Sequence, residues 1–176
     1  MIDIVPFIPV YQDGVVDLIL PIQQREFGLA IDLHEQPDLK EIPAFYQNGA
    51  GNFWVALDDG VVVGSIGLLD IGNEQAALRK MFVAAPMRGK PYRVADNLLA
   101  ELLAWSRRKR LREIYLGTTE KFTAAQHFYR KHAFAEIAKT DLPASFPVMA
   151  VDSVFFTRGV DSGKFAENYA NLSSDQ

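Results

Sequence analysis

Hydrophobic and polar residues follow a strand-like pattern most clearly between residues 53 and 69, where two β-rich runs flank the dipeptide Asp59-Gly60. The runs 53–57 and 61–69 on either side of this dipeptide predict a β-hairpin closed by a tight type I′ turn. A third strand is predicted at 77–84. Residues 94–106 instead repeat their apolar side chains at the i, i+4, i+5, i+8 and i+9 spacing of a helix with one buried face.

The rest of the chain predicts further strands and helices around this region. Residues 2–10 fit a first strand, which Pro6 confines to an edge or a bulge, and residues 13–27 fit a helix that Pro21 kinks or splits. The other predicted elements are a short helix at 38–47, a strand at 113–117, a helix at 122–132 with Thr119 as a candidate N-cap, and strands at 134–139 and 149–157. This order predicts one α/β domain over residues 1–158 with a mixed central sheet, followed by a polar tail at 159–176.

Composition favours a single soluble domain. The chain has 176 residues, of which 49% are hydrophobic and 23% are charged. This is enough for one well-formed core and differs from the composition of a disordered chain. The first residues lack the positive flank and the cleavage site of a signal peptide, and the apolar runs are too short to span a membrane. These features predict a cytoplasmic protein without a membrane partner.

The chain has no cysteine and three histidines. The lack of cysteine excludes disulfides, cysteine-bound zinc, iron–sulfur clusters and a thiol nucleophile. Because His34, His127 and His132 are widely spaced and lack a metal-ligand pattern, we predict neither a structural nor a catalytic metal. His127 and His132 are interpreted as surface or capping residues.

Charge is unevenly distributed within a net charge of −4. Residues 79–112 carry ten basic and two acidic residues, whereas residues 1–78 carry twelve acidic and two basic ones. The basic segment predicts a site for a localised anion, and the acidic segment suggests a cationic or neutral second substrate. The run Arg107–Arg112 could also indicate nucleic-acid binding. Its shortness, its lack of interleaved aromatic residues and the acidic net charge disfavour that function.

A basic loop lies between the predicted strand at 77–84 and the predicted helix at 94–106. It contains Arg88, Gly89, Lys90 and Arg93. A helix N-terminus offers backbone N–H groups and a positive dipole to a phosphate. The alternative is a solvated basic turn that caps a surface helix. The loop is neither a Walker A motif nor a Rossmann fingerprint.

Two segments together resemble the GNAT acyltransferases, which move an acetyl group from acetyl-coenzyme A to an amine. The first is Met81-Phe82-Val83 followed by Arg88-Gly89-Lys90-Pro91-Tyr92-Arg93-Val94-Ala95 and the pair Leu98-Leu99. The second is Ala125-Gln126-His127-Phe128-Tyr129-Arg130-Lys131-His132-Ala133-Phe134. The resemblance implies a single-domain GNAT fold over residues 1–158, with a mixed sheet of about six to seven strands and about four flanking helices.

The resemblance also implies how acetyl-CoA is bound. Backbone groups of Met81 and Val83 would hold the pantetheine arm. The stretch from Arg88 to Ala95 would hold the pyrophosphate. The implied cofactor-binding residues are Met81, Phe82, Val83, Arg88, Gly89, Lys90, Arg93, Val94 and Ala95.

Tyr129 is implied as the general acid that protonates the departing thiolate. A thiol has a pKa of about 8.5 and a phenol one of about 10, so proton donation is chemically reasonable as charge develops on sulfur. Without the resemblance, a tyrosine on this apolar helical face would be a core residue. Because the chain has no cysteine, an acetyl-cysteine intermediate is excluded and direct attack by the acceptor amine is the simpler route.

Four positions depart from the family pattern. Arg93 stands where a second glycine is usual, and Pro91 lacks an N–H donor near the same turn. Arg93 would either block close approach of the backbone to the pyrophosphate or replace an amide contact with its guanidinium, and we favour the second interpretation. Phe122 occupies a position that is often asparagine, so that cofactor contact is not carried over. Ala133 replaces a glycine, which we interpret as a small change.

The acceptor and the base are the least determined parts of the predicted site. Glu26 is the candidate base or amine anchor, with Asp38 and Glu74 as comparable alternatives. The acceptor is predicted to be a small-molecule or peptide amine, and the protein a monomer or a homodimer. The competing function is a non-catalytic acyl-CoA-binding module or sensor.

Overall fold

The hairpin around Asp59-Gly60 and the helices predicted at 94–106 and 122–132 are present in the computed structural model, which describes residues 1–161. Positive φ angles at Asp59 (46°) and Gly60 (84°) give the tight turn between the strands. The elements in chain order are β1 (Ile2–Pro6), the short 3-10 helix η1 (Pro9–Tyr11), α1 (Gln12–Pro21), a π-helical turn η2 (Ile22–Glu26), α2 (Pro37–Lys40), α3 (Ile42–Tyr46), β2 (Asn52–Asp58), β3 (Val61–Gly72), β4 (Gln75–Val83), the 3-10 helix η3 (Ala85–Met87), α4 (Val94–Arg108), β5 (Glu113–Thr118), α5 (Thr123–Lys131), β6 (Ala135–Ile137), the 3-10 helix η4 (Lys139–Asp141) and β7 (Val154–Gly159).

The seven strands form a mixed sheet in the order β1-β2-β3-β4-β5-β7-β6, which confirms the predicted α/β class. Strands β4 and β5 pair in parallel, whereas the pairs β1–β2, β2–β3, β5–β7 and β6–β7 are antiparallel. The chain divides into two compact units. The first comprises Met1–Asp70 and Leu78–Trp105, and the second comprises Ile71–Ala77 and the chain from Ser106 onward.

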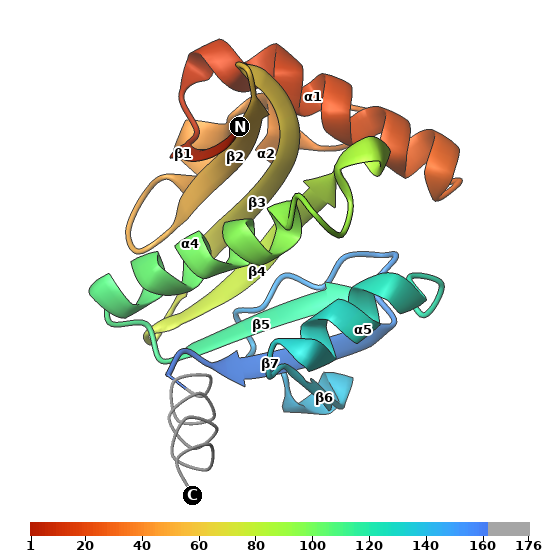
Figure 1. Cartoon of the computed structure of the whole chain (residues 1–176). Coiled ribbons are helices and arrows are strands. Elements are labelled where there is room, and N and C mark those ends of the chain that lie inside the picture. Colours follow the sequence, from red (N-terminus) through yellow and green to blue (C-terminus); the bar gives the residue numbers. More distant parts are fainter. Residues whose placement is uncertain (162–176) are drawn as a thin grey trace, which may run out of the picture. The chain divides into compact units, whose positions relative to one another are not determined.

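In the first unit, helices pack on both faces of β2. Phe53, Val55 and Leu57 belong to a core that also contains buried residues of α1, α2 and α3. The alternate residue Trp54 contacts Trp105 of α4 edge to face, with ring centroids 5.9 Å apart. Figure 1 shows α1 and α4 as the two long helices of this unit. Alternate side chains of β2 therefore point into two apolar layers, one on each face of the strand.

The predicted helix at 13–27 ends earlier as a regular α-helix, at Pro21, and continues as the π-helical turn η2. Proline removes a backbone donor and crowds the preceding turn, which explains the change at this residue. The predicted helix at 38–47 is two short helices, α2 and α3, that meet at Glu41. Pro37 and Pro43 stand in their first turns, where proline is tolerated.

In the second unit, β7 pairs with both β5 and β6, and α5 lies over this part of the sheet (Figure 1). The predicted N-cap Thr119 is wrong because α5 begins at Thr123, and the Thr119 hydroxyl instead accepts the N–H of Lys121. The predicted strand at 149–157 begins only at Val154, since Met149 and Asp152 close a turn by reciprocal hydrogen bonds. The predicted tail extends into residues 162–176, which lie outside the described residues.

Within residues 1–161, every helix is too short or too polar to cross a membrane. The same residues contain no group of three or more histidine, aspartate or glutamate side chains placed to hold a metal ion.

Candidate functional site

The predicted anion-binding loop joins β4 to α4 in the first unit. Gly89 and Arg93 both have left-handed backbones, with φ of 71° and 52°. The Arg93 N–H donates to the Gly89 carbonyl at 2.9 Å, and the Arg93 carbonyl accepts the N–H of Asn97 at 3.0 Å. The residue that replaces the family's second glycine therefore keeps the backbone conformation that glycine favours.

Close packing fixes the first turn of α4 on the sheet. A side chain added at Gly64 of β3 would lie 2.8 Å from Val94 and 3.1 Å from Leu98, so the glycine lets this turn approach. Val94 and Leu98 are both buried. Among the described residues, none accepts a hydrogen bond from the N–H of Val94 or Ala95. These two donors and the helix dipole form an end that favours a negatively charged group.

The loop cations differ in their surroundings. Arg88 is held within the protein: its Nε donates to the Val83 carbonyl at 2.9 Å, and its two terminal nitrogens donate to Glu26 at 2.7 and 3.0 Å. Lys90 and Arg93 are exposed, and their side chains have no hydrogen bond or ion pair with any described residue. Lys90 and Arg93 are therefore the loop cations that are open to an external anion.

Glu26, the candidate base, lies at the end of η2 in a bidentate ion pair with Arg88. Both carboxylate oxygens accept guanidinium donors, the bidentate geometry typical of a charge-assisted pair of hydrogen bonds. The structure thus brings Glu26 to the predicted cofactor loop. Glu74, an alternative candidate, forms an exposed ion pair with Arg112 at 2.7 Å.

Strand β4 contains the predicted pantetheine segment Met81–Val83. Its parallel pairing with β5 covers Gln75–Ala77, which are the first three of its nine residues. Lys80 has a φ of 53°, and the Ser65 hydroxyl donates to its carbonyl at 2.7 Å. Phe82 packs against the apolar core of the first unit. The end of β4 is therefore bent and anchored before the predicted cofactor loop begins.

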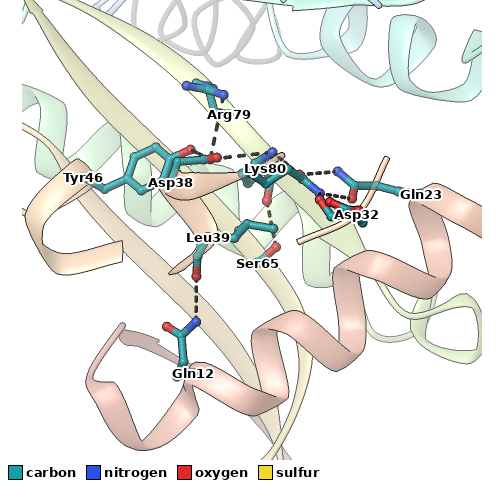
Figure 2. Close-up of polar contacts among 10 residues, drawn as sticks. Gln12, Gln23, Asp32, Asp38, Leu39, Tyr46, Ser65, Arg79 and Lys80 are labelled. Atoms are coloured by element: carbon teal, nitrogen blue, oxygen red, sulfur yellow. Dashed lines mark hydrogen bonds and ion pairs between the residues drawn. The ribbon is translucent and has the colours of Figure 1, made fainter. Parts of the chain in front are cut away.

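A buried polar cluster lies at this bend and was only partly foreseen, through Asp38. Figure 2 shows Asp38 of α2 among Tyr46 of α3 and two residues of β4, Arg79 and Lys80. The Tyr46 hydroxyl donates to Asp38 Oδ2 at 2.6 Å. Burial raises the pKa of the Tyr46 phenol well above its ordinary value; Arg79 opposes this rise and Asp38 adds to it. The phenol therefore remains a hydrogen-bond donor to Asp38.

Tyr129 lies in the second unit, on the inner face of α5. Its ring packs against Phe134 and Phe156, with centroids 5.6 and 6.0 Å away. Burial raises the pKa of the Tyr129 phenol far above its ordinary value. None of the described residues forms a hydrogen bond with the hydroxyl. The phenol keeps its proton and has no protein acceptor in this part of the chain.

Helix α5 ends in a Schellman motif at Ala133, where the family pattern has a glycine. Ala133 has a φ of 68°, its N–H donates to Arg130, and the N–H of Phe134 donates to the Tyr129 carbonyl at 3.0 Å. Glycine is the residue that adopts this conformation without strain. Replacement of the family's glycine by alanine is therefore more costly than the sequence suggested.

Comparisons of the sequence and of the structure with known proteins both find the family that the two sequence motifs resemble. The sequence profile of the Acetyltransferase (GNAT) family matches residues 16–134. A GNAT-family acetyltransferase of Staphylococcus aureus Mu50 is 38% identical, and its crystal structure matches with a TM-score of 0.87 over 91% of this chain and 99% of that one. N-acetyltransferase family 8 member 2 of Rattus norvegicus is 30% identical over 116 residues, which cover 59% of this chain and 50% of the rat protein. The chain spans about half the length of the curated relatives it matches.

A more distant structure is that of the PaiA N-acetyltransferase of Thermoplasma acidophilum, solved in complex with coenzyme A. It matches with a TM-score of 0.67 at 14% identity, over 90% of this chain and 99% of that one. At this identity the likeness concerns the fold alone.

Proposed function

We propose, since this chain belongs to the acetyltransferase (GNAT) family, that it transfers an acetyl group from acetyl-CoA to a primary amine by direct attack within a ternary complex. The observation that carries the proposal is the loop before α4. Arg93 keeps a glycine-like backbone there, and the open N–H groups of Val94 and Ala95 follow it directly. A loop of this kind suits a pyrophosphate.

We assign the binding of acetyl-CoA to the residues around this loop. Backbone groups of Met81 and Val83 would contact the pantetheine arm, and the N–H groups of Gly89, Val94 and Ala95 would contact the pyrophosphate. Lys90 and Arg93 would add charge, because their side chains are exposed beside the start of the helix. Arg88 would act differently: its contacts with Val83 and Glu26 fix the end of β4.

The proposed reaction forms one bond and breaks one. The neutral amine attacks the thioester carbonyl, an amide C–N bond forms, and the C–S bond breaks as the tetrahedral intermediate collapses. Tyr129 donates its proton to the departing sulfur, and the amine loses a proton to a base or to water. The sequence motif around Tyr129 supports this role; burial keeps the phenol protonated and also makes it a weaker acid, because it raises its pKa.

Glu26 is tested by Glu26→Gln. Because its carboxylate is shared with Arg88, we expect it to position the loop: KM for acetyl-CoA should rise up to about tenfold, while kcat stays within about threefold. Steady-state kinetics separates the two parameters. A fall in kcat of about a hundredfold, with KM unchanged, would instead make Glu26 the general base.

Arg93 and Ala133, which have positive φ at positions where the family pattern has glycine, give a matched pair of variants. Arg93→Gly and Ala133→Gly should each raise the free energy of unfolding by about 0.5–1 kcal/mol, because each relieves a left-handed backbone. Only Arg93→Gly should weaken acetyl-CoA binding, by about threefold to tenfold, because only it removes a cation from the proposed site. Denaturant unfolding and titration calorimetry measure both effects. If the two variants bind acetyl-CoA with equal affinity, the Arg93 guanidinium does not contribute to the proposed site.

Thermal stabilisation by acetyl-CoA tests the proposed function at the level of binding. A ligand at about a hundred times its Kd raises the free energy of unfolding by about 2.7 kcal/mol. We expect acetyl-CoA and CoA to raise Tm, and an equal concentration of adenosine to have a much smaller effect. No stabilisation by any acyl-CoA would overturn the proposal.

The competing function is a non-catalytic acyl-CoA-binding module, and it predicts stabilisation without turnover. We also propose that the acceptor is a small-molecule or peptide amine. Cytoplasmic location and a monomeric or homodimeric state likewise remain predictions from the sequence.

A further inference from the structure

Strand β4 directs two successive cationic side chains toward one carboxylate. Successive residues of a regular strand point to opposite faces of the sheet. Arg79 and Lys80 nevertheless both approach Asp38 Oδ2, at 3.8 and 3.6 Å. The left-handed backbone of Lys80 accounts for this, and the hydrogen bond from Ser65 to its carbonyl holds the bend. Strain in the middle of a strand is typical of functional positions.

Asp38 is held mainly by a third residue. Its Oδ2 accepts the short hydrogen bond from Tyr46, whereas both cations lie beyond ordinary hydrogen-bond distance from it. Lys80 donates to Gln36 Oε1 at 2.6 Å, and Gln36 pairs with Gln23 of η2 through two amide hydrogen bonds. The bend in β4 is thus tied to two segments that precede β2 in the chain (Figure 2).

Arg79 and Lys80 have the capacity to bind an additional anion. A guanidinium has five N–H donors and an ammonium three, so either group can hold more than one acceptor at a time. The side chains are 12% and 9% exposed, and charge-assisted hydrogen bonds are stronger in such partly desolvated positions. A planar guanidinium matches a planar carboxylate, while the nearby Asp38 disfavours a dianion such as phosphate.

The position of the pair relates it to the proposed reaction. Arg79 and Lys80 immediately precede Met81–Val83, the segment assigned to the acyl-CoA arm. A strand advances by about 3.3 Å per residue, so the backbone of both cations lies within about 7 Å of the start of that segment.

We propose that Arg79 and Lys80 bind a carboxylate of the acceptor, so that the amine substrate is an amino acid or another amine that carries a carboxylate. This inference rests on the proposed acetyl transfer. It differs from the cationic or neutral acceptor that the acidic first 78 residues suggested.

The test uses product analogues that lack a titratable amine. N-acetyl amino acids and their carboxamides, for example N-acetyl-leucine and N-acetyl-leucinamide, differ in the carboxylate alone. A set of such pairs with small, branched, aromatic and acidic side chains is titrated into the protein with saturating CoA. At least one acid should bind about tenfold or more tighter than its amide. Arg79→Gln and Lys80→Gln should each bring this ratio close to one.

Charge-conserving and remote variants separate recognition from folding. Arg79→Lys and Lys80→Arg should keep most of the preference, and Lys40→Gln, at an exposed lysine of α2, should keep all of it. Equal binding of acids and amides, or no binding of any acid, would overturn the inference. Amine-dependent thiol release with amines that lack a carboxylate would then leave the proposed function intact. Failure to bind CoA would instead count against the proposed function itself.

Discussion

Replacing Tyr129 by phenylalanine is expected to lower kcat by about a hundredfold or more, while Kd for acetyl-CoA stays within about threefold. The substitution keeps the ring that packs against Phe134 and Phe156. It removes only the hydroxyl, which no described residue holds by a hydrogen bond. The protein should therefore fold normally and lose its proton donor.

Single-turnover thiol release and equilibrium binding of acetyl-CoA measure the two quantities separately. Tyr11→Phe is a suitable control, because Tyr11 packs beside the core of the first unit and has no proposed role in the reaction. Its kcat should match that of the original protein. An unchanged kcat in Tyr129→Phe would remove the tyrosine from the mechanism.

Replacing Asp38 by alanine is expected to lower the free energy of unfolding by about 3 kcal/mol or more. The variant would leave Arg79 and Lys80 close together without their shared carboxylate, and it would deprive the Tyr46 hydroxyl of its acceptor. For a chain of this length, the corresponding fall in Tm is roughly 6–12 °C.

Two companion variants identify the source of this loss. Asp38→Asn keeps an acceptor for Tyr46 and should be less destabilising than Asp38→Ala, whereas Asp17→Ala, at an exposed position of α1, should leave Tm nearly unchanged. Thermal unfolding followed by circular dichroism measures all three. If Asp38→Ala melts like Asp17→Ala, the cluster has no role in stability, and the bend of β4 needs another explanation.

The sequence predicted those elements whose periodicity is strong and local. The hairpin at Asp59-Gly60 and the buried face of α4 depend on neighbouring residues alone, so the period of two and the helical period identified them. The end of α1 and the start of β7 were less predictable. Pro21 allows a π-helical turn to follow, and the turn between Met149 and Asp152 depends on a side-chain carboxylate.

The candidate site shows the same contrast. The basic loop between β4 and α4 was predictable because its glycine, its cations and the following helix are contiguous in the chain. The cluster at β4 was not, since it combines residues from α2, α3 and β4 and requires the left-handed backbone of Lys80. Asp38 was considered only as an alternative base or amine anchor, and its contacts with Tyr46 and two cations were not foreseen. Arg93 and Ala133 were visible as departures from a pattern, but their positive φ angles came only from the structure.

The most direct test of acetyl transfer is release of free thiol from acetyl-CoA in the presence of a panel of amines, with the acetylated amine identified by mass spectrometry. The panel should pair each amino acid with the corresponding amine that lacks the carboxylate. We predict that thiol release requires both the protein and an amine, and that the amount of thiol released equals the amount of acetylated amine. Tight binding of acetyl-CoA without amine-dependent thiol release across the panel would contradict the account and identify the protein as a binding module.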